Sequence, residues 1–280
     1  MSTRKPPKGQ KQNFFEKGGK PGSSRNKRER SASGNPQNEN WLYGDHAVLA
    51  ALANPKRKIR RLILSKAKMD RLEDEALSLI RNFPSPEILD GEKIRNLLPE
   101  NAIHQGIAIL PSPLPELGIE DLNELAGEQT AFSVAVLDQV TDPHNVGAIL
   151  RSAAAFNIRA IIVPDRHTPS VTGVLARSAS GAVESVPLIR VNNLSRALDG
   201  LAEMGFWRIG MDGRADQTLE QAIRGSSRLA LVLGSEGKGL RRLTAEKCDL
   251  LGKLPISESV ESLNVSNAAA IAFYEIARQK

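Results

Sequence analysis

The sequence predicts an α/β protein whose larger part is a parallel sheet covered by helices on both faces. From residue 131 onward, short apolar runs alternate with segments of helical periodicity. Strands separated by helices of this length form crossover units, which place successive strands parallel. The expected strands are 132–137, 159–163, 186–190, 206–210, 228–233 and 249–255, and the expected helices are 145–156, 170–179, 194–204, 239–247 and 264–278.

A smaller α/β unit precedes this sheet. Residues 41–53 read as a helix that ends before Pro55, and residues 70–83 read as an amphipathic helix. Residues 59–65 and 106–110 read as strands. Three prolines within 111–115, followed by an acidic stretch, indicate a linker that includes a short helix. We therefore expect a basic tail at 1–40, a small domain at 41–112, a linker at 113–130 and a larger domain at 131–280.

The net charge of +6 belongs to the tail. Residues 1–40 contain ten Lys and Arg against three Asp and Glu, whereas the other 240 residues contain 28 against 29. The tail is rich in Gly, Pro, Ser, Asn and Gln, so we expect it to be disordered. A cationic arm of this kind attracts phosphate groups without sequence preference. The alternative is an extension that serves only solubility.

Composition excludes several classes of protein. No apolar run approaches the roughly 18 residues that span a bilayer, and the N-terminus lacks the apolar core of a signal peptide. The single cysteine, Cys248, cannot form an intrachain disulfide and is too little for a zinc or iron–sulfur site. We expect a cytoplasmic protein with no metal and no membrane partner.

Three segments lie at or beyond the carboxyl ends of expected strands, where open α/β sheets bind ligands. The first is DPHNVGAILRSA (142–153), in which Arg151 projects about 140° from Val146 and lies outside the apolar stripe. The second is LVLGSEGKGL (231–240), which is neither a P-loop nor a dinucleotide fingerprint. The third is LPI (254–256) followed by ESLNVSNAAAIAFYE (261–275). Taken singly, their polar residues also suit ordinary roles such as a surface arginine, a turn or a helix N-cap.

Together the three segments resemble the signature motifs of the SpoU (TrmH-like) RNA 2′-O-ribose methyltransferases of the SPOUT superfamily, over residues 131–280. YGDHAV (43–48) and HQG (104–106) resemble the small substrate-binding domain of the bacterial large-subunit rRNA guanosine methyltransferase branch. The resemblance implies a C-terminal trefoil knot, a homodimer, and methyl transfer from S-adenosylmethionine to a ribose 2′-hydroxyl, in a guanosine of 23S rRNA.

The resemblance also implies residue roles. Main-chain groups at Gly234, Leu254, Ile256 and Leu263 would bind the cofactor. Arg151 would hold the substrate's phosphate and ribose, because a guanidinium does not readily give up a proton. Glu236 would orient Arg151 or the target nucleoside, and the residues that would fix the hydroxyl and the loop geometry are Asn145, Ser262 and Asn264.

One position departs from the family pattern, because Glu258 stands where members usually carry glycine. We therefore expect the backbone to differ there. Three other functions compete with the main prediction: a tRNA 2′-O-methyltransferase, a non-catalytic RNA-binding protein on the same fold, and a dinucleotide-dependent oxidoreductase. The oxidoreductase lacks its glycine fingerprint, and a pure RNA-binding protein has no need of Arg151 together with Glu236.

Overall fold

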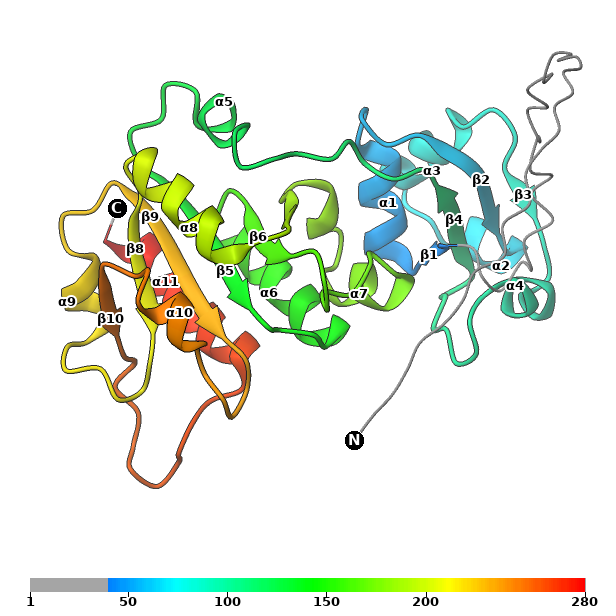
Figure 1. The fold of residues 1–280 in the computed structure, drawn as a ribbon. Coiled ribbons are helices and arrows are strands. Elements are labelled where there is room, and N and C mark those ends of the chain that lie inside the picture. Colours follow the sequence, from blue (N-terminus) through cyan, green and yellow to red (C-terminus); the bar gives the residue numbers. More distant parts are fainter. Residues whose placement is uncertain (1–39, 280) are drawn as a thin grey trace, which may run out of the picture. The chain divides into compact units, whose positions relative to one another are not determined.

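The computed structural model describes residues 40–279 (Figure 1). Of the predicted basic tail, only Asn40 falls within this range, so the expectation of disorder lies outside the described residues. The rest of the chain forms a small sheet followed by a larger one.

The larger sheet has six strands, and every pairing in it is parallel. Its order is β10-β8-β9-β5-β6-β7, so the longest strands, β5 and β9, lie in the middle. Both are mostly buried and mostly apolar, as expected for strands covered on two faces. The predicted parallel sheet is confirmed. Its strands are β5 (Phe132–Asp138), β6 (Ile161–Pro164), β7 (Leu188–Val191), β8 (Trp207–Met211), β9 (Arg228–Gly234) and β10 (Leu250–Gly252).

Alternate residues of β5 face two different cores. Ala135 and Leu137 join the cluster that contains α6 (Pro143–Ala155) and α11 (Val265–Arg278). Val134 and Val136 join the cluster that contains α8 (Leu194–Glu203). Figure 1 accordingly shows α8 on one side of the sheet and α6 and α11 on the other. The remaining helices of this part are α7 (Gly173–Ser178), η2 (Ala182–Glu184), α9 (Leu219–Ile223) and α10 (Arg242–Ala245).

The helices nearest the strand ends begin where the sequence provides a cap. The Asp142 side chain accepts a hydrogen bond from the His144 amide, and Pro143 occupies the first turn of α6. The Asn264 side chain accepts from the amides of Ser266 and Asn267 and so caps α11. These caps set the direction in which both helices leave the sheet.

The small sheet has the order β1-β4-β2-β3. β4 pairs antiparallel with β1 and β2, while β2 and β3 are parallel. The predicted helix 41–53 is wrong at its start, because Leu42–Tyr43 form an edge strand and Gly44 turns the chain at φ +89°. The elements are β1 (Leu42–Tyr43), α1 (Asp45–Ala53), β2 (Ile59–Leu64), α2 (Lys66–Met69), α3 (Asp74–Arg81), β3 (Glu87–Ile88), α4 (Gly91–Leu97) and β4 (Ile107–Pro111), and α5 (Leu122–Ala126) lies in the segment predicted as a linker.

Two other elements are shorter than predicted, because some of their predicted residues lie in loops. Helix 239–247 is reduced to α10, because residues 235–240 form a tight turn. Strand 249–255 is reduced to β10, which ends before Pro255. The short helices α4 and α9 were not predicted from the sequence.

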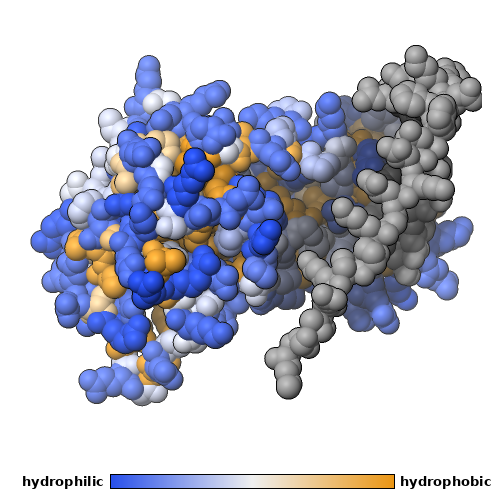
Figure 2. Space-filling view, viewed as in Figure 1, coloured by the Kyte–Doolittle hydropathy of each residue, from blue (hydrophilic) through white to orange (hydrophobic). Residues whose placement is uncertain are grey.

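One apolar cluster joins the small sheet to the larger one. It contains Ala47, Val48 and Ala51 of α1 as well as Leu175 and Ala176 of α7. Figure 2 shows mainly hydrophilic residues on the visible face, with smaller hydrophobic patches between them. Among residues 40–279, no helix is long and apolar enough to span a membrane.

Candidate functional site

Three loops leave the carboxyl ends of parallel strands in the larger sheet. Residues 139–142 follow β5, residues 235–241 follow β9, and residues 253–264 follow β10. In open parallel sheets this edge is where ligands bind. All three sequence segments that stood out contribute to these loops or to the helices that begin at them.

Glu236 joins the three segments through one carboxylate oxygen. Its Oε1 accepts hydrogen bonds from Asn145 Nδ2 at 3.0 Å, from Asn264 Nδ2 at 2.5 Å and from the Val265 amide at 3.3 Å. Asn264 Nδ2 also lies 3.1 Å from Asn145 Oδ1. The structure therefore brings together three predicted site residues that are 28 to 119 positions apart in sequence. Hydrogen bonds to a carboxylate are stronger than those between neutral groups, so this link joins the three segments.

The loop after β9 is a closed turn that requires glycine. Ser235 and Gly239 pair with each other through both backbone amides, at 3.2 and 2.9 Å. Gly237 and Gly239 have φ values of +75° and +64°, a region that side chains disfavour. A Cβ on Gly234 would lie 2.2 Å from the carbonyl carbon of Gly239. The close return of the chain therefore depends on the absence of a side chain at Gly234.

A buried carboxylate binds Arg241, the last residue of the same loop. Asp138, the last residue of β5, is fully buried and accepts from the Arg241 amide at 3.0 Å and from Arg241 Nε at 2.6 Å. Sequence reasoning did not single out Asp138. The available signal was a charged residue ending an otherwise apolar strand, because a buried charge requires a partner.

The loop after β10 carries the other predicted cofactor residues. Leu254 and Leu263 are half-buried and Ile256 is exposed, and their main-chain groups make no hydrogen bond with any residue in the described range. Free amides and carbonyls beside aliphatic side chains can receive the polar edge and the flat face of an adenine ring. These residues therefore fit a cofactor that contains adenosine.

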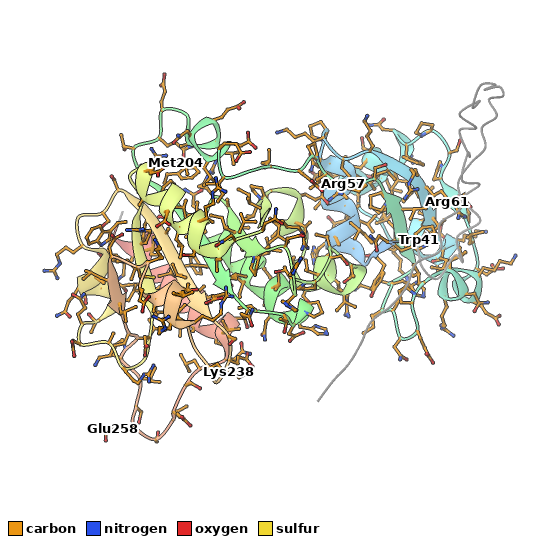
Figure 3. All side chains as sticks on the ribbon, in the orientation of Figure 1. Trp41, Arg57, Arg61, Met204, Lys238 and Glu258 are labelled. Atoms are coloured by element: carbon orange, nitrogen blue, oxygen red, sulfur yellow. The ribbon has the colours of Figure 1, made fainter. Side chains whose placement is uncertain are left out.

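Glu258 lies at the tip of this loop, as Figure 3 shows. It is exposed, and its φ is not positive, so this backbone does not require the glycine that family members usually carry. The departure from the family pattern is accommodated at the point of the loop farthest from the sheet.

Arg151 does not contact Glu236. It is exposed on α6, as its place outside the Val146, Ile149 and Leu150 stripe predicts, and it lines a hollow beside α1. It makes no hydrogen bond or ion pair with any residue from 40 to 279. The predicted orientation of Arg151 by Glu236 is therefore absent from this structure, in which Glu236 bonds Asn145, Asn264 and Val265 instead.

Ser262 also lies apart from the hydrogen-bonded group. It is exposed in the loop before α11 and makes no hydrogen bond to another described residue. Of the two possible N-caps, Ser262 and Asn264, it is Asn264 that caps α11.

Two other groups capable of chemistry have shifted pKa values. Burial raises the pKa of the Cys248 thiol to about 12, so it stays protonated at neutral pH. Burial, followed by the nearby Arg95 charge, lowers the pKa of His104, whose Nδ1 accepts from the Gly106 amide at 3.0 Å. In the part of the chain that the structure describes, no three His, Cys, Asp or Glu side chains gather as metal ligands.

Comparison with known proteins assigns both parts of the chain. Residues 133–274 match the model of the SpoU rRNA Methylase family, and residues 41–117 match that of the RNA 2′-O ribose methyltransferase substrate binding domain. The chain is 40% identical over 243 residues to 23S rRNA (guanosine-2′-O-)-methyltransferase RlmB of Pseudomonas aeruginosa, covering 85% of this chain and 96% of that one. It is 40% identical over 242 residues to the Escherichia coli protein of the same name, covering 85% and 98%.

A solved structure has the same fold. The SpoU methyltransferase AviRb from Streptomyces viridochromogenes, in complex with AdoMet, matches with a TM-score of 0.70 at 24% identity, covering 85% of this chain and 89% of that one. The predicted enzyme class, an S-adenosylmethionine-dependent RNA 2′-O-methyltransferase, is confirmed by these matches. On the strength of its two domain matches and its full-length relatives, the chain belongs to the SpoU rRNA methylase family.

Proposed function

We propose that this protein transfers a methyl group from S-adenosylmethionine to the ribose 2′-hydroxyl of a guanosine in 23S rRNA. The observation that carries the proposal is the hydrogen-bonded link of Glu236 with Asn145 and Asn264 at the carboxyl edge of the sheet. The substrate follows the relatives, whose names specify 23S rRNA guanosine and which align over nearly their whole length.

The cofactor would be held among the loops after β9 and β10. Gly234 lets the loop after β9 return closely on itself, and the main-chain groups of Leu254, Ile256 and Leu263, which have no partner among residues 40–279, would bond the adenosine part. Bound there, S-adenosylmethionine supplies an electrophilic methyl group. The protein's part is to order these loops, and the Glu236 link does so by joining the segments on either side.

The ribose hydroxyl would be positioned by polar groups of the same edge. Asn145 and Asn264 present amide groups held by Glu236, and Ser262 has a hydroxyl free to reach the substrate. Arg151 would bind the phosphate next to the reacting ribose. A guanidinium group does not readily give up a proton, so Arg151 serves as a cation rather than as a base. The hydroxyl proton would pass to a phosphate oxygen or to water.

The path of the chain supports the trefoil knot expected from the resemblance. β10 is an edge strand, yet the chain that follows it returns to Asn145 and Glu236 beside the central strands β5 and β9. Residues 253–264 must therefore cross the ends of β8 and β9 before α11 begins. We also propose the domain limits 1–40, 41–112, 113–130 and 131–280, and a cytoplasmic location, where ribosomal RNA is modified.

An exposed apolar group on α11 supports a homodimer. Ile271 and Tyr274 are 46% and 54% exposed, and the Tyr274 ring packs edge-on against Phe156 at 5.8 Å. The dimer would bury these side chains between two copies of α11. Light scattering at micromolar concentration would detect it, and a monomer there would contradict it.

A methylation assay tests the function directly. The full-length protein, S-adenosylmethionine carrying a labelled methyl group and 23S rRNA from a strain that lacks this protein should give one methylated guanosine. Mapping by resistance of the 2′-O-methylated position to alkaline cleavage would locate it. Methylation of tRNA instead would refute the substrate, and failure of S-adenosylmethionine to bind at millimolar concentration would refute the cofactor.

A further inference from the structure

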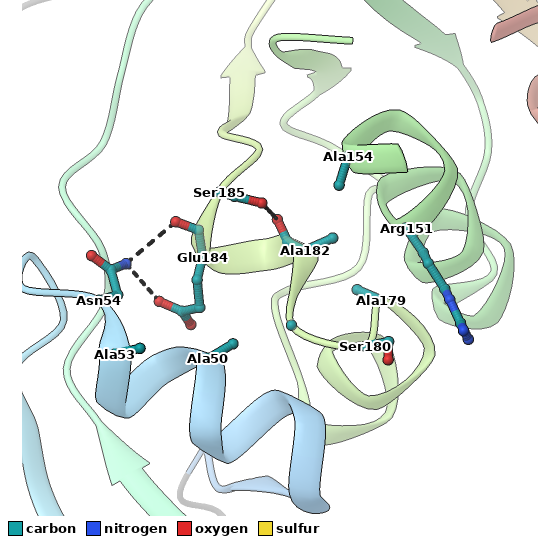
Figure 4. A pocket seen from close by; sticks show the side chains of 11 residues that line it. Ala50, Ala53, Asn54, Arg151, Ala154, Ala179, Ser180, Ala182, Glu184 and Ser185 are labelled. Atoms are coloured by element: carbon teal, nitrogen blue, oxygen red, sulfur yellow. Dashed lines mark hydrogen bonds between the residues drawn. The ribbon is translucent and has the colours of Figure 1, made fainter. Parts of the chain in front are cut away.

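A hollow of about 610 Å³ lies beside Arg151, where the small domain meets the larger one (Figure 4). It is bounded by α1, by the outer face of α6 and by residues 179–185, which follow α7. Its volume falls within the range of about 300–1,000 Å³ typical of small-molecule sites. None of the cofactor residues assigned above lines it.

The middle of this hollow is made of small side chains. Figure 4 shows Ala50 and Ala53 on α1 and Ala154 on α6, with Ala179 and Ala182 between them. Alanine methyl groups leave an apolar surface without protruding atoms. Such a surface suits a flat ring, whereas branched side chains would fill it.

Polar donors without partners lie at the Arg151 end. The Ser180 hydroxyl and the Gly181 amide make no hydrogen bond with a described residue, and neither does the Arg151 guanidinium. Serine hydroxyls, backbone amides and arginine are the groups that commonly contact nucleic-acid phosphates. The guanidinium plane can also stack on an unpaired base.

The opposite end is rigid. Glu184 accepts from Arg57 Nη2 at 2.7 Å and from Asn54 Nδ2 at 2.8 Å, and its side chain is only 6% exposed. These bonds run from the small domain to η2 of the larger one, so they fix the two walls of the hollow relative to each other. The hollow is thus preformed.

We propose that this hollow receives a nucleobase of the substrate RNA, splayed out of its stack, with the adjoining phosphate bound by Arg151, Ser180 and the Gly181 amide. The inference rests on the proposed function, because it assigns the ligand as RNA. A cation and donors that have no partner among residues 40–279 favour an anionic ligand over an apolar peptide. Sequence-specific RNA recognition commonly targets such unstacked bases.

Filling the hollow from each wall tests the proposal. The variants are Ala53→Leu on α1 and Ala154→Leu on α6. Their matched controls are Ala67→Leu on α2 and Ala155→Leu on α6, which replace exposed helical alanines that do not line the hollow. For each full-length protein, RNA affinity without cofactor, the KM for 23S rRNA and the Kd for S-adenosylmethionine would be measured.

Both filling variants should weaken RNA binding and raise the RNA KM at least about tenfold, which corresponds to about 1.4 kcal/mol. Their Kd for S-adenosylmethionine should stay within about twofold of the wild type, and both controls should behave as the wild type. Unchanged RNA binding in the filling variants would overturn the proposal. An equal loss of RNA and cofactor binding would also overturn it, by assigning the alanines to stability.

The measurement of RNA affinity distinguishes a failure of this proposal from a failure of the proposed function. If the wild-type protein bound 23S rRNA but failed to methylate it, the proposed function would fail, while the comparison of RNA affinities would still decide on the hollow. Ser180→Ala provides a variant without added bulk. It should weaken RNA binding about threefold to tenfold, by loss of one hydrogen bond, without changing cofactor binding.

Discussion

Removing Glu184 should destabilise the protein more than removing any exposed ion pair. Glu184 and Arg57 are 6% and 5% exposed, and the carboxylate accepts hydrogen bonds from both Arg57 and Asn54. In Glu184→Ala, the Arg57 guanidinium keeps, within the described part of the chain, only its bond to the Ser112 carbonyl, at 2.9 Å. A buried charge is then left without its counter-charge.

The expected loss in free energy of unfolding is about 3–5 kcal/mol, the usual cost of breaking a buried pair from one side. For a folded region of this size, each kcal/mol lowers the melting temperature by about 2–4 °C, so the midpoint should fall by about 6–20 °C. Replacing both partners, in Arg57→Met with Glu184→Leu, should cost much less, because no charge remains buried.

Urea and thermal unfolding followed by circular dichroism would measure these differences. The matched control is Glu246→Ala, which breaks the Arg242–Glu246 pair, whose side chains are 77% and 53% exposed. That change should cost less than about 0.5 kcal/mol. The reasoning is refuted if Glu184→Ala costs less than about 1 kcal/mol, or if the double variant is as unstable as the single one.

Four further outcomes are expected. Arg151→Ala should lower kcat by at least about 100-fold with an unchanged melting temperature, because Arg151 is exposed; activity within threefold would exclude it from the mechanism. Gly234→Ala should abolish S-adenosylmethionine binding in calorimetry, because its Cβ would displace the loop backbone; wild-type binding would contradict this. The hydrogen-bonded Arg208 guanidinium lowers the pKa of the Asp249 carboxyl. This pair therefore stabilises the fold above about pH 4, and the stabilisation is lost as pH falls through the lowered pKa. Arg208→Met should remove this pH dependence of stability from acid unfolding curves. Deleting residues 1–40, which carry a net charge of +7, should flatten the salt dependence of RNA binding by about 0.7–0.9 log units per lost phosphate contact, and an unchanged slope would leave the tail a solubility element.

Local patterns predicted the large sheet well, for a physical reason. β5 and β9 are mostly apolar runs of seven residues, a length and composition typical of strands buried on both faces. The start of the chain's first element was wrong, because Trp41, Leu42 and Tyr43 are as compatible with a helix as with a strand. Their pairing with β4, more than 60 residues away, decides between the two.

The candidate site was predicted less completely. Arg151 was correctly placed outside the buried stripe, since helical periodicity determines direction. The contacts of Glu236 with Asn145 and Asn264 depend on loops that meet only in the folded sheet, and no local pattern encodes them. Asp138 was missed because a terminal aspartate reads as a turn residue until its burial is known.

The clasp between Asp138 and Arg241 has a consequence for how the site comes apart. The Asp138 carboxylate is fully buried at the end of the central strand β5, and among residues 40–279 its hydrogen-bond donors are the backbone amide and Nε of Arg241. If the loop that carries Glu236 opened, the Asp138 carboxylate would therefore stay buried without the Arg241 donors. The loop and the middle of the sheet should open together as one cooperative unit. The surface loop beside the proposed ligand site should therefore open as rarely as the interior of the sheet does.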